Sequence, residues 1–312
     1  AIVGTTVAPW QLFFQQSNII DKRITPRWIN YERADTIIGA FVVVIGAGAI
    51  VAVTAFAFAG TPFAGHFDDA GAVARGLGAV LGHTAGVFFA VILLNASLIG
   101  AAAVTLSTSY AFGDVFGAKH SLNRGPLDAK LFYATFALMV AAAGGIVLIP
   151  GAPLGLITTS VQALAGVLLP SATVFLLLLC NDRQVLGPWS NPPWLNAIAT
   201  VIIGVLIELS LILMASTIFP SLDVTRLFYY LSGVLLAALL AGGLYALRNR
   251  SRASVELRHE ERERRSTWTM PPLALLERPA WSPGRKAAMI TLRGYLVVAV
   301  LLLVVKTVQL GH

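Results

Sequence analysis

Residues 4–10 read Gly-Thr-Thr-Val-Ala-Pro-Trp and lie within a long apolar run. Pro9 has no backbone N–H and its ring clashes with the carbonyl one turn earlier, so a regular helix cannot pass through it undisturbed. Gly4 loosens the backbone, and the Thr5 and Thr6 hydroxyls can bond backbone groups that a break sets free. Broken helices of this kind hold the substrate in secondary transporters. The stretch predicts a broken helix at Thr5–Pro9, with a simple proline kink as the alternative.

The composition is that of a membrane protein. Of the 312 residues, 57% are hydrophobic and only 12% are charged, whereas a soluble domain carries about 25% charged residues. The single cysteine, Cys180, excludes an internal disulfide framework and a cysteine-based metal site. The fold class expected from these features is an all-α polytopic membrane protein.

Apolar segments with the length of a membrane span recur along the whole chain. Several contain clusters of small residues, such as residues 46–49 and 100–103, that permit close helix packing in lipid. The pattern predicts eight helices, of which the first is the broken one: residues 1–20, 36–59, 85–112, 131–149, 154–180, 194–219, 227–247 and 287–310.

Basic residues gather in alternate loops. Residues 21–35, 113–130 and 248–286 are rich in Lys and Arg, and the last of these contains ten of them, whereas residues 60–84 and 150–153 contain few or none. Cytoplasmic loops carry such an excess, so the side of residues 21–35 is predicted to be cytoplasmic. Residues 248–286 are interpreted as a charged, solvated cytoplasmic segment, and residues 60–84 as a loop.

Residues 4–16, which read Gly-Thr-Thr-Val-Ala-Pro-Trp-Gln-Leu-Phe-Phe-Gln-Gln, resemble the sixth helix of the Nramp divalent-metal transporters. That family typically reads Gly-Ala-Thr-Val-Met-Pro-His-Asn-Leu-Tyr-Leu-His-Ser. Ala8 stands where the family has its metal-binding methionine, and Trp10 and Gln15 stand where it has histidines. This altered set resembles the Nramp-related magnesium transporters. The resemblance continues through residues 164–187.

The resemblance, which covers roughly residues 1–219, implies the second half of an inverted-repeat, LeuT-like transporter fold. The chain is then expected to start at the sixth transmembrane helix and to be the C-terminal part of a longer protein. Residues 1–180 would form most of the second repeat, with five helices, and residues 181–247 would add two transmembrane helices. The charged segment 248–286 and a final transmembrane helix at 287–310 would follow. Residues 181–187 are expected to form a capped cytoplasmic turn.

The resemblance also implies where the metal ion binds. The Thr5 carbonyl corresponds to a ligand of the family, and Ala8 occupies the position of its thioether ligand. The cavity around the ion would be lined by Gly4, Thr6, Trp10, Gln11, Gln15 and Gln162. Hydrogen bonding between helices is the alternative role of the three glutamines. A carboxylate ligand is expected in the family's first helix, which the chain does not contain.

The function implied is transport of a divalent cation, Mg²⁺ and also Mn²⁺, through the cell membrane. The ion is cargo, no cofactor or nucleic acid partner is expected, and the missing histidines argue against proton coupling. A proton-coupled Mn²⁺/Fe²⁺ transporter and an amino-acid carrier of the same superfold are alternatives. An integral-membrane enzyme is disfavoured because Glu208 is the lone acid deep in a predicted span.

Overall fold

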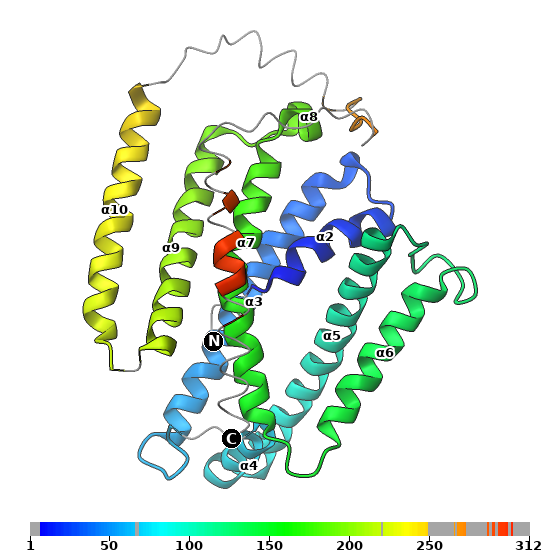
Figure 1. Cartoon of the computed structure of the whole chain (residues 1–312). Coiled ribbons are helices and arrows are strands. Elements are labelled where there is room, and N and C mark those ends of the chain that lie inside the picture. The colour runs from blue at the N-terminus through cyan, green and yellow to red at the C-terminus, as the bar shows by residue number, and fades with distance from the viewer. Residues whose placement is uncertain are drawn as a thin grey trace. The chain divides into compact units, whose positions relative to one another are not determined.

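The structure, a computed structural model, describes residues 7–65, 69–219 and 221–248, together with residues 265, 267–272, 286, 289–290, 293–298 and 301. Side chains are not described at 217–218 and 245–247. Every regular element among these residues is helical (Figure 1), which confirms the all-α fold class. The chain divides into two compact units, residues 10–161 and residues 1–9 with 162–312.

The unit of residues 10–161 contains most of α2, the short 3₁₀ helix η1 and the helices α3 to α6. Their bounds are Pro9–Asp21 for α2, Pro26–Trp28 for η1, Ile29–Phe58 for α3, Ala70–Leu81 for α4, His83–Phe116 for α5 and Lys130–Val147 for α6. Helices α5 and α6 pack side by side in antiparallel directions (Figure 1).

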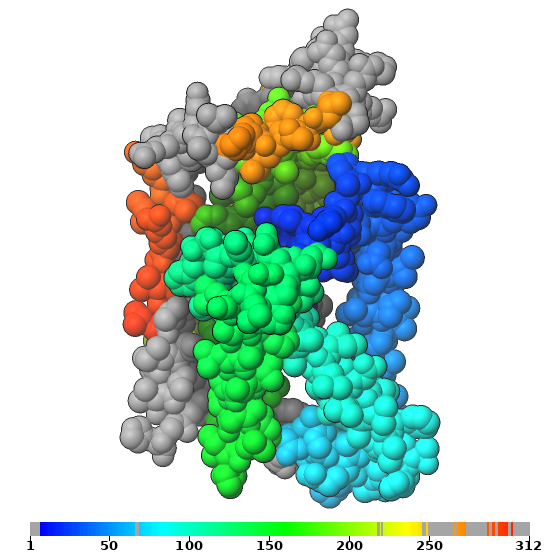
Figure 2. Space-filling view, turned by 90° about the vertical axis from the view of Figure 1, so that its right-hand side faces the viewer, coloured from blue at the N-terminus to red at the C-terminus, as the bar shows by residue number. Residues whose placement is uncertain are grey.

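Helix α4 corrects the sequence analysis, which assigned residues 60–84 to a loop. Asp69 caps its start, since the carboxylate accepts a hydrogen bond from the Ala72 N–H at 2.6 Å. The helix has only 12 residues, too few to span a bilayer. Figure 2 shows α4 and the start of α5, in cyan, against the light-blue end of α3.

The glycines at which helices pack closely are not those of the small-residue clusters at residues 46–49 and 100–103. A Cβ atom added to Gly86 of α5 would lie 2.7 Å from the carbonyl oxygen of Ala74 in α4. Gly46, Gly48 and Gly100 have no neighbour within 4 Å of such an atom among the described residues. The tight helix pair in this unit is therefore α4 and α5.

The apolar core of this unit lies where α2, α5 and α6 meet. Tyr110 of α5 and Phe132 of α6 are each 2% exposed, and Ala129 precedes α6. Phe14 of α2 packs against this cluster. The core fixes the position of α2 against α5.

The other unit contains most of α7 and the helices that follow it. The bounds are Leu154–Cys180 for α7, Arg183–Leu186 for α8, Gly187–Trp189 for the 3₁₀ helix η2, Pro193–Ile218 for α9 and Val224–Arg248 for α10. The predicted capped turn after α7 is present, because the Asp182 carboxylate accepts from the Gln184 N–H at 2.9 Å.

Helices α9 and α10 form a close pair within this unit. A Cβ atom on Gly204 of α9 would lie 2.6 Å from Leu235 of α10. Glu208, which is 7% exposed, accepts a hydrogen bond from the Ser232 hydroxyl at 2.5 Å. The acid that the sequence singled out therefore joins α9 to α10 through a hydrogen bond.

Six helices among the described residues are long and apolar enough to cross a membrane: η1 with α3, then α5, α6, α7, α9 and α10. They confirm the six predicted segments between residues 36 and 247. Large apolar side chains such as Phe41 and Phe56 are 67% and 85% exposed, as expected for helices that face lipid. The predicted first and last helices lie partly outside the described residues.

Candidate functional site

Helix α2 begins at Pro9, directly after a bend at Val7. Proline suits the first helical position because its fixed φ is already helical and the N–H that it lacks would have no partner there. Ala8, outside the helix, is 8% exposed. The described half of the predicted broken helix thus starts at Pro9, where the break was expected. Gly4, Thr5 and Thr6 lie outside the described residues.

The first turn of α2 is held by a buried hydroxyl of α5. The Ser107 side chain, 0% exposed, donates to the Trp10 carbonyl at 3.2 Å. The rings of Trp10 and Phe14 have centroids 6.0 Å apart. Thr105 and Ser109, also buried, donate to carbonyls of α5 itself. A buried hydroxyl of α5 therefore anchors the backbone just after Pro9.

The predicted cavity-lining glutamines differ in their surroundings. Gln11 is half-buried, whereas Gln15, one turn later on α2, is exposed. Gln162 is half-buried on α7 and belongs to the other unit. Trp10 is half-buried as well. Their assignment to one cavity stays a prediction.

The proline of α7 lies inside a continuous helix. Pro170 removes one backbone hydrogen bond, and nearby hydroxyls bond carbonyls of the same turns: Ser171 with Leu168 at 2.7 Å, and Thr173 with Pro170 at 2.9 Å. The Tyr295 hydroxyl donates to the carbonyl of Val167. These groups stabilise the helix around its proline, eight residues beyond Gln162.

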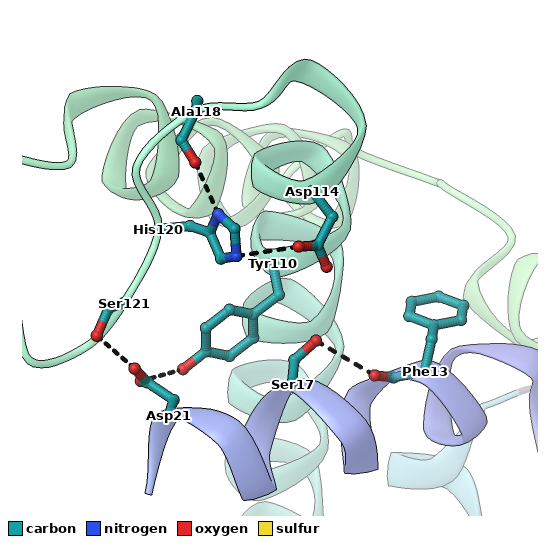
Figure 3. A network of polar contacts seen from close by, with 8 residues as sticks. All are labelled: Phe13, Ser17, Asp21, Tyr110, Asp114, Ala118, His120 and Ser121. Atoms are coloured by element: carbon teal, nitrogen blue, oxygen red, sulfur yellow. Dashed lines mark hydrogen bonds and ion pairs between the residues drawn. The ribbon is translucent and has the colours of Figure 1, made fainter. Parts of the chain in front are cut away.

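The last residue of α2 is the centre of a polar cluster that the sequence analysis missed. The Asp21 carboxylate accepts hydrogen bonds from the Tyr110 hydroxyl at 2.5 Å and from the Ser121 hydroxyl (Figure 3). It also accepts from the Leu122 N–H at 2.9 Å and the Asn123 amide at 3.3 Å. We call these five residues the Asp21 clamp. It ties the end of α2 to α5 and to the loop that follows α5.

The clamp alters the acidity of its carboxyl group. Burial raises the pKa of Asp21, but the hydrogen bonds donated by Ser121, Tyr110, Leu122 and Asn123 lower it more, and the net pKa lies below the ordinary value of 3.8. Asp21 is therefore ionised at neutral pH. Its charge strengthens each of the hydrogen bonds it accepts.

A polar cavity of about 630 Å³ opens beside the clamp. It is lined by residues of α2, of the end of α5 and of the loop before α6. His120 lies at its wall, with Nε2 3.1 Å from the Asp114 carboxylate and Nδ1 2.7 Å from the Ala118 carbonyl (Figure 3). Among the described residues, no group of three or more His, Cys, Asp or Glu side chains could hold a metal ion.

The family of the chain follows from its sequence profile. The profile described as "Nramp: Natural resistance-associated macrophage protein-like" matches residues 1–216. The chain belongs to the Nramp family. The match begins ahead of α2 and ends in the last turn of α9, and the six long apolar helices accord with the LeuT-like fold of the family. No curated protein and no solved structure matches the chain.

Membership of the Nramp family supports transport of divalent metal cations through a membrane by a multi-pass helical protein. It also supports a transporter rather than an enzyme. The matched region contains every residue that the sequence analysis assigned to the ion site, from Gly4 to Gln162.

Proposed function

We propose that this Nramp protein carries Mg²⁺, and with lower preference Mn²⁺, across the cell membrane without coupling to protons. The ion would bind at the break before α2. The observation that supports this proposal is Ala8, a buried residue directly before Pro9 at the position where the family has its methionine.

The identity of residue 8 determines which ions are favoured. A thioether is a soft ligand that favours Mn²⁺, Fe²⁺ or Cd²⁺. The methyl group of Ala8 offers no lone pair and leaves more room. Mg²⁺ prefers oxygen ligands and keeps several of its waters. We propose that the Thr5 carbonyl binds the ion and that the amides of Gln11 and Gln162 hydrogen-bond its waters.

The absence of proton coupling is inferred from Trp10 and Gln15. Histidine can relay a proton near neutral pH, whereas an indole and an amide do not titrate there. The driving force would then be the ion gradient and the membrane potential. A proton-coupled Mn²⁺/Fe²⁺ carrier is the alternative, and it would need a proton relay elsewhere in the protein.

Residue 8 provides the test of selectivity. In calorimetric titrations, Ala8→Met should raise the affinity for Cd²⁺ and Mn²⁺ relative to Mg²⁺ by roughly tenfold, about 1.4 kcal/mol. Ala8→Leu is the matched control, because leucine has a similar volume but no sulfur. Equal relative affinities in the parent and the methionine variant would mean that residue 8 does not face the ion.

A further inference from the structure

The geometry points to His120 as a residue that positions the end of α2. Its protonated ring hydrogen-bonds both to Asp114 of α5 and to Ala118 of the loop of residues 118–123, and we call this arrangement the lock. The lock keeps the loop on α5, where the loop binds the end of α2. We propose that pH on this side of the membrane, which the basic loops assign to the cytoplasm, controls how tightly α2 is held. The expected effect of pH on the transport rate rests on the proposed function, whereas the lock formed by His120 is independent of it.

Both ring nitrogens of His120 face hydrogen-bond acceptors. Nδ1 lies 2.7 Å from the carbonyl oxygen of Ala118, and Nε2 lies 3.1 Å from a carboxylate oxygen of Asp114 (Figure 3). A neutral imidazole has one N–H and one lone pair, so it can satisfy only one of these acceptors. The doubly protonated ring donates to both. The arrangement therefore matches the charged form of the side chain.

The imidazole ring of His120 packs into a space on α5 beside Gly113, which we call its seat. A Cβ atom added to Gly113 would lie 2.3 Å from Cγ of His120, so the imidazole occupies the space that any other residue at position 113 would fill. The edge of the ring meets Tyr110, with centroids 6.1 Å apart and planes at 81°. Contacts on two sides fix the ring against the last turns of α5.

The seat of His120 is joined directly to the clamp on α2. Ser121, Leu122 and Asn123 follow His120 in the chain, and each donates a hydrogen bond to Asp21. Tyr110, which contacts the ring, donates to Asp21 as well. A loop that leaves its seat would therefore remove three of the four groups that hold the end of α2.

The charges around the ring are mixed, and water can reach them. His120 is half-buried and lines the 630 Å³ cavity, so it can exchange protons with solvent. The titratable and charged groups that share this cavity with it are Asp21, Arg23, Tyr110, Asp114, Arg124 and Asp128. Asp114 is the only one of them that forms an ion pair with His120 within the described part of the chain.

Loss of the ring proton turns one of the two hydrogen bonds into a contact between two acceptors. The loop should then leave its seat more often, and the hold on α2 should weaken. A carrier must move its broken helices during the cycle. We therefore expect a slower cycle at acidic pH, where the lock is closed, and a faster one at neutral pH.

Hydrogen exchange of the full chain in detergent tests the lock without any transport. In the wild type, backbone protection of residues 17–24 and 117–124 should fall about tenfold between about pH 5.5 and about pH 7.5, after correction for intrinsic exchange. His120→Gln should remove this pH dependence. His83→Gln, an exposed histidine at the opposite end of α5, is the matched control and should retain it.

A second variant covers the case in which His120→Gln does not fold. Asp114→Asn keeps the histidine but removes the charge of its partner, and it should also flatten the pH dependence. Protection that does not change with pH in the wild type would overturn the proposal. A fall in protection with rising pH that persists in both His120→Gln and Asp114→Asn would overturn the proposal as well.

Uptake of Mg²⁺ into proteoliposomes, with equal pH on both sides, tests the consequence for transport. The initial rate should be several-fold lower at the acidic pH in the wild type and in His83→Gln, and independent of pH in His120→Gln. Equal pH dependence in all three would refute control of the rate by His120. Absence of uptake in every protein would instead refute the proposed function and leave the exchange result standing.

Discussion

At the residue scale, one carboxylate joins three parts of the protein. Asp21 ends α2 and accepts hydrogen bonds from α5 through Tyr110 and from the following loop through Ser121, Leu122 and Asn123. Hydrogen bonds to an ionised group contribute about 1.5–3 kcal/mol each. Several of them at one end of a helix make Asp21 the principal anchor of that end.

Removal of the Asp21 charge should lower the thermal stability of the protein and change how that stability depends on pH. The folded pKa of Asp21 is depressed, so its contribution is fully present above the ordinary pKa and is lost as pH falls through the folded value. Asp21→Asn should therefore melt at a lower temperature than the wild type at pH 7, with the difference shrinking below about pH 4. Thermal denaturation in detergent at both pH values measures this, with Asp35→Asn as the control. The same difference in melting temperature between variant and wild type at both pH values would contradict the role of the Asp21 charge.

The clamp could not be predicted from the sequence because its partners are remote. Asp21 and Tyr110 are 89 positions apart, and Asp21 and Ser121 are 100 apart. An aspartate at the end of an apolar run, such as Asp21, is typical of an ordinary loop residue. His120 has no other histidine, cysteine or carboxylate at a spacing typical of metal ligands. The one local signal was Gly113, a glycine in the last turns of α5 that the ring of His120 requires.

At the element scale, hydrophobic patterning defined the long helices well. The bounds of α7 agree with the prediction at both ends, since Pro153 precedes its first residue and the capped turn at Asp182 follows its last. Helix α4 was missed because its 12 residues are rich in glycine and alanine and too short for a span. The tertiary contact at Gly86, which stabilises it, carries no periodic signal.

Helix α7 should contribute one polar side chain to transport. If the Gln162 amide binds waters of the ion, Gln162→Leu should reduce Mg²⁺ uptake by roughly tenfold. Gln184→Leu, at an exposed position of α8 outside the predicted ion cavity, is the matched control and should have a smaller effect. Both variants should elute as folded protein in size-exclusion chromatography. Full uptake by folded Gln162→Leu would assign the amide to helix packing.

At the scale of the whole molecule, the proposed cargo follows from family membership together with the altered residues at the start of α2. The family supports a divalent cation as cargo, and Ala8, Trp10 and Gln15 distinguish this chain from members with a thioether and histidines. Two positive charges that cross about 100 mV gain about 4.6 kcal/mol. That energy suffices for roughly a thousandfold accumulation with no proton.

Mg²⁺ uptake into proteoliposomes that contain a pH-sensitive dye tests whether the protein carries Mg²⁺ without protons. We expect saturable uptake that an inside-negative potential accelerates, with no change of internal pH. Protein-free vesicles give the background leak, and Mn²⁺ in the outer solution should compete. Internal acidification that follows the Mg²⁺ concentration and vanishes without protein would contradict proton-independent transport, and the absence of any uptake would contradict Mg²⁺ as the cargo.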